Sequence, residues 1–246
     1  MLTALRAAAD GLVAVLLAPR CAACDRPLER PTNGPVCAFC WEAILPITPP
    51  VCDICGDPLP TWREASIESA RCARCRRRRV AIDRGRAVGV YDGALRQILH
   101  AFKYEGRRTI AAPVARLMAQ AGQQLLATAD VVVPVPLHRR RERSRGFNQA
   151  RDLALQVGSP VADILRRTRP TPSQTDLPAA RRHANVRGAF VVAPLGRAAI
   201  DGRIVVLIDD VSTTGATLEA CARALKDAGA REVRALTAAR VVTRRP

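Results

Sequence analysis

The sequence predicts an α/β protein: a parallel β-sheet with helices on both faces, preceded by a small cysteine-rich module. Two observations lead to this prediction. After Arg86, fully apolar strand-like runs alternate with helical patterns, which is typical of a buried parallel sheet. Before it, eight of the nine cysteines form four Cys-x-x-Cys pairs. With 246 residues, 48% of them hydrophobic, the chain is long enough for both parts. We expect a helix over 1–20, the cysteine module over 21–80 and the α/β domain over 86–246.

The elements of the α/β domain follow from hydrophobic periodicity. Short runs without polar interruption predict buried strands, and apolar residues spaced by three or four predict helices. Strands are expected over 87–91, 131–133, 204–208 and 233–238, and helices over 94–102, 110–126, 147–157 and 217–227. Gly229 suits the C-cap of the last helix. Because ligands of parallel sheets bind beyond the carboxyl ends of the strands, the loops after Val133 and Ile208 form the candidate site.

The N-terminal segment, Leu2 to Leu17, is apolar and allows three interpretations. A signal peptide or membrane span is disfavoured because Asp10 interrupts a run that is too short to cross a bilayer. A lipid anchor on Cys21 is disfavoured because Arg20 stands where a small residue is needed. The pattern favours an amphipathic helix with a stripe formed by Leu2, Leu5, Ala9, Leu12, Val13 and Leu16. We therefore expect no membrane span and a cytoplasmic protein.

The cysteine pairs indicate metal binding. Two thiolates three positions apart on a tight turn point at one tetrahedral ion, and two such turns complete a four-sulfur zinc site. Disulfides are the alternative, and a reducing cytoplasm disfavours them. The expected zinc ligands are Cys21, Cys24, Cys37, Cys40, Cys52, Cys55, Cys72 and Cys75. Because a four-sulfur site has no open coordination position, we expect two structural zinc ions.

The cysteine module is a duplication. The stretch from Cys21 to Leu28 recurs in altered form from Cys52 to Leu59, and a Cys-Ala-x-Cys pair follows each copy. Duplication favours two ribbons in tandem over an interleaved arrangement in which the first and third pairs share an ion. Cys221 stands apart, on one helical stripe with Leu218 and Leu225, and is expected to pack in the core.

The charge balance indicates polyanionic partners. The net charge is +17, and it is concentrated in two blocks. Residues 71–86 hold eight arginines and one aspartate, and residues 139–151 hold six arginines and one glutamate. A solvated surface is the alternative interpretation of each block. Only 3% of the residues are aromatic, so long base-stacking platforms are not expected.

The segment from Val205 to Leu218 has the most specific pattern. An apolar strand delivers Asp209 and Asp210 to the sheet edge, and a hydroxyl-rich turn with Gly215 then opens a helix. Free amides at a helix start bind phosphate, and paired carboxylates accept hydrogen bonds from ribose hydroxyls, so a ribose 5-phosphate is the expected ligand. We expect both acids in a surface loop. A strand–turn–helix without a ligand would explain the hydroxyl-rich turn, but it does not explain the two adjacent acids at the end of the strand. The Gly-Lys-Ser/Thr and three-glycine nucleotide motifs are absent from this segment.

This loop resembles the phosphoribosyl-diphosphate (PRPP) motif of type I phosphoribosyltransferases. The rest of the chain is similar to one branch of that class, the competence protein F family linked to DNA uptake. Besides the loop, the resemblance rests on Gly89 to Arg96, Phe102 to Arg107, Val135 to Arg140, Arg145 to Gln149, and Arg182 with Asn185 to Phe190. With the double zinc ribbon, it covers nearly the whole chain and implies a Rossmann-like phosphoribosyltransferase fold.

The resemblance also implies residue roles. The acids would hold the ribose hydroxyls and the turn the 5-phosphate, which makes Asp209, Asp210, Val211, Ser212, Thr213, Thr214, Gly215, Ala216 and Thr217 the first PRPP-binding set. The diphosphate, bridged by Mg²⁺, would bind Val135, Pro136, Leu137, His138 and Arg139, with 140–148 as a mobile cover. The expected catalytic residues are Asp210, Arg139 and Arg145. Pro136 has an alternative role, which is to end a strand. Phe147 has one as well, which is to pack in the core.

The sequence is compatible with two functions. The resemblance implies cytosolic handling of incoming single-stranded DNA during natural transformation, with DNA-uptake or helicase proteins as partners. The alternative is a nucleotide-salvage transferase with a base or amine acceptor. Enzymes of this class recognise the acceptor through a hood above the sheet. Only six residues follow Arg240, so we expect either acceptor contacts from Arg71 to Tyr104 or from the zinc module, or no acceptor site at all. The basic blocks favour a DNA-associated protein, and the complete loop is compatible with turnover.

Overall fold

The computed structural model of the chain describes residues 2–59, 70–78, 80–169, 186 and 188–242. Within these ranges, a four-stranded sheet has the order β1-β6-β5-β2, and every neighbouring pair is parallel. The sheet strands are β1 (Arg84–Val90), β6 (Glu232–Arg240), β5 (Ile204–Ser212) and β2 (Val131–Pro134). A separate antiparallel pair consists of β3 (Leu165–Arg167) and β4 (Phe190–Val192). The predicted parallel α/β fold is therefore confirmed.

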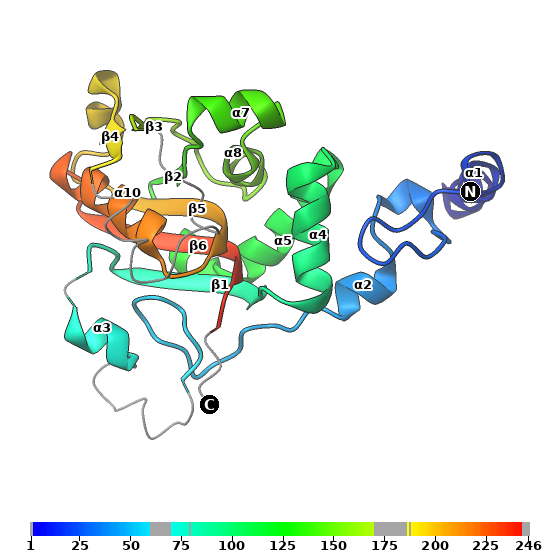
Figure 1. Cartoon of the computed structure of the whole chain (residues 1–246), viewed down its shortest axis with the longest axis horizontal. Helices are drawn as coiled ribbons and strands as arrows, with labels where there is room; N and C mark the ends of the chain where they lie inside the picture. The colour runs from blue at the N-terminus through cyan, green and yellow to red at the C-terminus, as the bar shows by residue number, and fades with distance from the viewer. Residues whose placement is uncertain (1, 60–69, 79, 170–185, 187, 243–246) are drawn as a thin grey trace.

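Helices cover both faces of this sheet (Figure 1). On one face lie α5 (Ala111–Ala121) and α8 (Gln149–Ala154), and α10 (Ala216–Asp227) covers the other. Along β5, Val206 and Ile208 pack into the core on the α5 side, while Val205 and Leu207 pack on the α10 side. The other helices in the described part of the chain are α1 (Leu2–Leu17), η1 (Pro31–Asn33), α2 (Ala38–Glu42), α3 (Ala73–Arg77), α4 (Gly93–Tyr104), η2 (Arg108–Ile110), α6 (Gln123–Leu126), α7 (Arg139–Arg145) and η4 (Pro194–Ala199).

Several element boundaries differ from the expected ones for identifiable reasons. The helix expected over 110–126 is interrupted at Gly122, where a Cβ atom would lie 2.5 Å from Leu236 Cδ2. The glycine permits this close approach and separates α5 from α6. Strand β5 continues beyond Ile208 because the ladder with β6 continues, pairing Asp209 with Thr237. The acids therefore belong to a strand and not to a surface loop.

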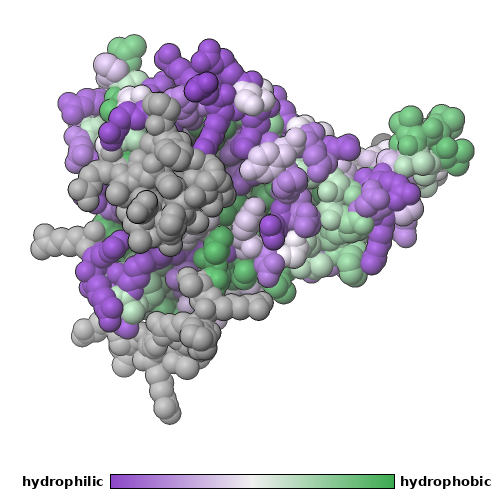
Figure 2. Space-filling view, in the orientation of Figure 1, coloured by the Kyte–Doolittle hydropathy of each residue, from purple (hydrophilic) through white to green (hydrophobic). Residues whose placement is uncertain are grey.

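The N-terminal helix α1 is attached through a polar contact rather than through its apolar stripe. Asp10 is buried and accepts hydrogen bonds from Thr32 N at 2.9 Å and Thr32 Oγ1 at 2.7 Å. Leu5, Leu12 and Leu16 are each more than 60% exposed, and this end of the molecule is hydrophobic in Figure 2. Among the described helices, none has the length and apolar character that a membrane span requires.

Candidate functional site

The loop between β5 and α10 has the geometry expected of a phosphate site. Gly215 adopts φ +76° immediately before α10, a conformation that disfavours other residues, and open space surrounds the position its Cβ would take. Its carbonyl accepts from Glu219 N at 2.9 Å, so the helix starts here. Thr214 Oγ1 is buried and has no hydrogen-bond partner among the described residues. A helix start beside an unsatisfied hydroxyl can accommodate an anion.

The two acids of β5 occupy different environments. Asp210 is buried and forms an ion pair with Lys103 at the end of α4, with 2.7 Å between Nζ and Oδ2. Its Oδ1 accepts from Val211 N at 2.6 Å. Asp209 is half-buried, and its Oδ1 accepts from Asp210 N at 2.9 Å. The expectation that both acids lie in a surface loop is wrong, because the β5–β6 ladder extends through them.

These environments shift the pKa values of Asp209, Asp210 and Lys103 in different directions. Burial raises the pKa of Asp209 well above its ordinary value, and the Asp210 carboxylate adds to this rise. Burial opposes ionisation of Asp210, but the ion pair with Lys103, together with hydrogen bonds with Asp209 and Val211, lowers the pKa of that carboxyl. Burial likewise acts against the charge on Lys103, while Asp210 raises its pKa above the ordinary value. Lys103 and Asp210 are therefore ionised together, and Asp209 is the acid that favours its neutral form.

The segment after β2 lies beside this loop, because β2 and β5 are neighbouring parallel strands. Val135 N donates to Ile208 O at 2.9 Å, which brings the predicted diphosphate segment next to the predicted phosphate segment. Val135 and Pro136 are buried, Leu137 and His138 are half-buried, and Arg139 is exposed. His138 caps α7 by accepting from Arg140 N at 3.3 Å. The segment expected to be a mobile cover thus includes the helix α7.

Three polar residues connect the segments around the site: Arg145 at the end of α7, and Asn148 and Gln149 after it. Asn148 is buried, donates to Val135 O at 3.1 Å and accepts from Ala150 N at 3.0 Å, so it ties α8 to the segment after β2. Gln149 Oε1 accepts from Arg145 Nη1 at 2.6 Å. The Arg145 guanidinium also lies 5.1 Å from the centre of the Tyr104 ring. Phe147 is buried against Phe102, which agrees with its alternative role in the core.

A groove of about 710 Å³ opens at Lys103, the ion-pair partner of Asp210. It is lined by Lys103, Tyr104, Gly106, Arg140, Arg141, Ser144 and Arg145. Tyr104 is 64% exposed there, which is unusual for so large a ring. The end of α4 and the basic helix α7 therefore line one polar groove, which includes the ion-pair partner of Asp210.

Sequence reasoning did not predict the contacts that three cations, Lys103, Arg74 and Arg240, make near the site, although Arg74 belongs to the first basic block. Lys103 lies within the family motif Phe102 to Arg107, and its partner Asp210 is far away in the sequence. Arg74 donates through Nη1 to Thr214 O at 3.2 Å, and Arg240 donates through Nη1 to Ser212 Oγ at 3.3 Å. No periodicity could have indicated these contacts, since each joins segments that only the fold brings together. Arg182 and Asn185 of the predicted motif lie outside the described residues.

The cysteines form two separate groups, Cys21, Cys24, Cys37 and Cys40 in one, and Cys52, Cys55, Cys72 and Cys75 in the other. The tandem arrangement is thus observed. Within the groups, Sγ atoms lie 3.8 Å apart for Cys21 and Cys40 and 3.7 Å apart for Cys55 and Cys72. A tetrahedral zinc ion with bonds of about 2.3 Å requires sulfur atoms roughly 3.8 Å apart, so both groups fit zinc. Cys221 is fully buried on α10, as expected for a core residue.

Comparisons with known proteins agree with this architecture. Residues 103–245 match the family described as phosphoribosyl transferase domain, and residues 12–76 match the double zinc ribbon domain. The first match covers more than half of the chain. The protein therefore combines a double zinc ribbon with a phosphoribosyltransferase domain.

Relatives match the chain over most of its length. Competence protein F of Haemophilus influenzae is 29% identical over 224 residues, which cover 87% of this chain and 93% of that protein. DNA utilization protein YhgH of Salmonella typhimurium is 33% identical over 230 residues, with the same two coverages. Competence protein ComFC of Bacillus subtilis is 28% identical over 198 residues, 79% of each chain. The chain belongs to the competence protein F family.

Proposed function

We propose that this protein binds PRPP with Mg²⁺ at the β5–α10 loop and handles incoming single-stranded DNA in the cytosol during natural transformation. The main support is the position of the acid pair, the phosphate loop and the segment after β2 at neighbouring strand ends. The names of the relatives add support, since two refer to competence and one to DNA utilization.

The chemical parts of PRPP correspond to groups at this loop. Thr214 Oγ1 would gain the partner it lacks by donating to a 5-phosphate oxygen, together with the first amides of α10. Asp209 offers a carboxyl to the ribose hydroxyls. Carboxyl oxygens and phosphate oxygens are also the ligands that Mg²⁺ prefers, so the donor set fits this ion. When bound, Mg²⁺ would neutralise charge on the diphosphate.

Cations around the groove would stabilise a leaving diphosphate. In a transfer reaction, the bond from ribose C1 to the diphosphate oxygen breaks with its electron pair on the diphosphate, and a bond from the acceptor to C1 forms. Arg139 begins α7, and Arg145 is held at the groove by Gln149 and Tyr104. We assign both to the diphosphate and assign Asp210, fixed by Lys103, to the ribose.

Both basic blocks border this site, which supports a path for a nucleic-acid backbone. Arg74 of α3 contacts the loop at Thr214, and α7 contributes Arg140, Arg141 and Arg145 to the groove. Arg76, Arg77 and Arg78 are exposed next to Arg74. Arginines could therefore neutralise nucleic-acid phosphates on two sides of the loop. Because few aromatic side chains are available to stack on bases, we expect little sequence-specific recognition.

The groove beside Asp210 also supports the second function, a transferase with a base or amine acceptor. It opens next to the position proposed for the ribose and presents Lys103 and the exposed Tyr104. These residues come from the end of the 71–104 stretch in which acceptor contacts were expected. An acceptor bound there would be close to the bond that breaks.

Calorimetric titration tests the proposal. PRPP with Mg²⁺ is expected to bind more tightly than ribose 5-phosphate or diphosphate alone, because only PRPP reaches both strand ends. A protein that binds the three equally, or none of them, contradicts the proposed site. Diphosphate release measured with bases, nucleosides and single-stranded oligonucleotides then separates the transferase from a protein that binds PRPP without turnover.

A further inference from the structure

The second zinc ribbon contacts the predicted phosphate loop directly. Arg74 lies between Cys72 and Cys75 on α3 and donates through Nη1 to Thr214 O at 3.2 Å. Cys72 is the N-cap of α3, and both cysteines belong to the second four-sulfur group. The position of Arg74, and with it the contact to the loop, is therefore set by two residues of the metal centre.

A second connection passes through Arg240 at the end of β6. Its Nε donates to Asp57 Oδ1 at 2.5 Å, and its Nη1 donates to Ser212 Oγ at 3.3 Å. Arg240 is only 3% exposed, and its backbone is paired with Ser212 in the sheet. The carbonyl of Asp57 accepts from Cys52 N at 2.7 Å, so Asp57 is part of the first metal-binding turn of this ribbon. A partly buried ion pair thus joins this turn to the start of the loop.

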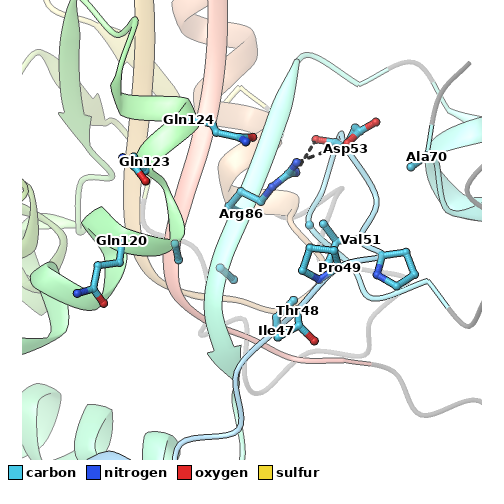
Figure 3. A pocket seen from close by; sticks show the side chains of 14 residues that line it. Ile47, Thr48, Pro49, Val51, Asp53, Ala70, Arg86, Gln120, Gln123 and Gln124 are labelled. Carbon is cyan, nitrogen blue, oxygen red and sulfur yellow. Dashed lines mark hydrogen bonds and ion pairs between the residues drawn. The ribbon is translucent and has the colours of Figure 1, made fainter. Parts of the chain in front are cut away.

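The same ribbon is seated against β1. A Cβ atom on Gly56 would lie 2.9 Å from Gly85 O, so the two backbones meet without room for a side chain. Asp53 and Arg86 form an ion pair of 3.5 Å beside this contact, and Figure 3 shows them converging from the ribbon and from β1. The backbone adds a hydrogen bond from Gly85 N to Asp53 O at 3.0 Å. The ribbon is therefore fixed to the sheet as well as to the loop.

The first ribbon provides an internal comparison, because the two ribbons are copies of one another. In the duplicated pattern, the contact residues Asp53, Gly56, Asp57 and Arg74 correspond to Ala22, Asp25, Arg26 and Phe39. All four positions differ. In the first ribbon, Arg26 lies 4.7 Å from the centre of the Phe39 ring, and Phe39 is 58% exposed. The copies thus share their metal ligands and differ at each of these four positions, where the second ribbon contacts the sheet or the loop.

We propose that Arg74 and Asp57 are positioning residues of the PRPP site, and that the second ribbon, unlike the first, holds the phosphate loop in its binding geometry. Arg74 fixes the Thr214 carbonyl, and Asp57 fixes Ser212 through Arg240, so the loop is held near both ends. The role in PRPP affinity rests on the proposed PRPP function. The positioning of the loop in the free protein does not.

Hydrogen exchange of the unliganded full-length protein, followed by PRPP titration, tests this inference. Arg74→Ala is expected to accelerate exchange in the peptide over 211–216 and to weaken Mg²⁺–PRPP binding, each by about tenfold, which corresponds to the loss of one hydrogen bond from a charged donor. Asp57→Asn is expected to act in the same direction. Arg74→Lys should restore part of the affinity, because an ammonium can also donate to Thr214 O.

Matched variants in the first ribbon are the controls. Phe39→Ala and Arg26→Gln are expected to leave loop exchange and PRPP affinity unchanged, with two zinc ions per chain in every variant. The inference is overturned if Arg74→Ala and Asp57→Asn both leave loop exchange unchanged, or if the first-ribbon variants have equal effects. A wild-type protein that does not bind PRPP refutes the proposed function, and the exchange data then still decide the positioning role.

Discussion

Lys103 and Asp210 form an ion pair in the protein interior, with 2.7 Å between Nζ and Oδ2 and side chains that are 13% and 6% exposed. The pair links the last turn of α4 to the strand that delivers the proposed ribose-binding acids. Because removing one partner leaves a buried charge without compensation, this contact couples the stability of the fold to the chemistry of the site.

Lys103→Met is therefore expected to destabilise the protein by roughly 3–5 kcal/mol, measured by urea unfolding. The double variant Lys103→Met with Asp210→Leu removes both charges and is expected to be more stable than the Lys103→Met protein. If the free-energy losses of the two substitutions instead add up, the broken ion pair is not the source of the destabilisation.

The same pair predicts a dependence of stability on pH. The folded-state pKa of Asp210 is lowered, so its contribution to stability is present above the pKa of an unfolded aspartate, about 3.9, and is lost as the pH falls through the lower folded value. Unfolding measured between about pH 5 and pH 2 should show this loss in the wild type. Lys103→Met lacks the partner that lowers the pKa, so this part of the acid dependence should disappear.

Asp209 is the better probe of ligand binding, because Asp210 also has a structural role. Asp209→Asn is expected to keep the fold and to weaken Mg²⁺–PRPP binding by about tenfold, whereas Asp210→Asn should also lower stability. Since burial raises the pKa of Asp209, its ionised form and therefore wild-type affinity should increase with pH. Titration calorimetry at several pH values measures both effects. Unaltered PRPP affinity in a well-folded Asp209→Asn protein would refute the ribose assignment.

Metal analysis of the purified protein is expected to give two zinc ions per chain. Chelation should unfold the ribbons, because so small a module lacks an adequate core of its own. Cys221→Ala is the matched control and should retain both ions, since Cys221 lies in the core of α10 and burial raises the pKa of its thiol. Disulfides found in freshly prepared protein would contradict the zinc assignment.

Binding of single-stranded DNA is expected to be tolerant of sequence and to weaken with salt, with a log–log slope of about 0.7 per neutralised phosphate. Arg76→Gln with Arg77→Gln should reduce that slope while leaving PRPP affinity unchanged, because both side chains are exposed on α3. The control is Arg203→Gln with Arg231→Gln, which removes the same amount of charge at the amino ends of β5 and β6, far from the loop. This control variant should have nearly the wild-type salt slope. Fluorescence anisotropy measures the slopes, and binding that ignores salt would exclude the proposed backbone path.

Local patterns in the sequence were sufficient for the fold class, the two cysteine groups and the turn that opens α10. Apolar runs such as Val131 to Val133 are stable only where both faces of the strand are buried, and spaced thiolate pairs specify a tetrahedral metal site within one short segment of the chain. The turn at Gly215 is likewise a local feature, because a positive φ and a helix start depend on adjacent residues.

Contacts between distant segments were decided only by the tertiary structure. Lys103 reaches Asp210, Arg74 reaches Thr214, and Asp57 reaches Arg240 because three separate elements meet at one sheet edge. Burial of the acids, which sequence reasoning placed in a surface loop, also depends on how far the β5–β6 ladder extends. Spacing along the chain specifies which groups a short segment presents. Which groups meet, and how far water is excluded from them, is determined by the packing of whole elements.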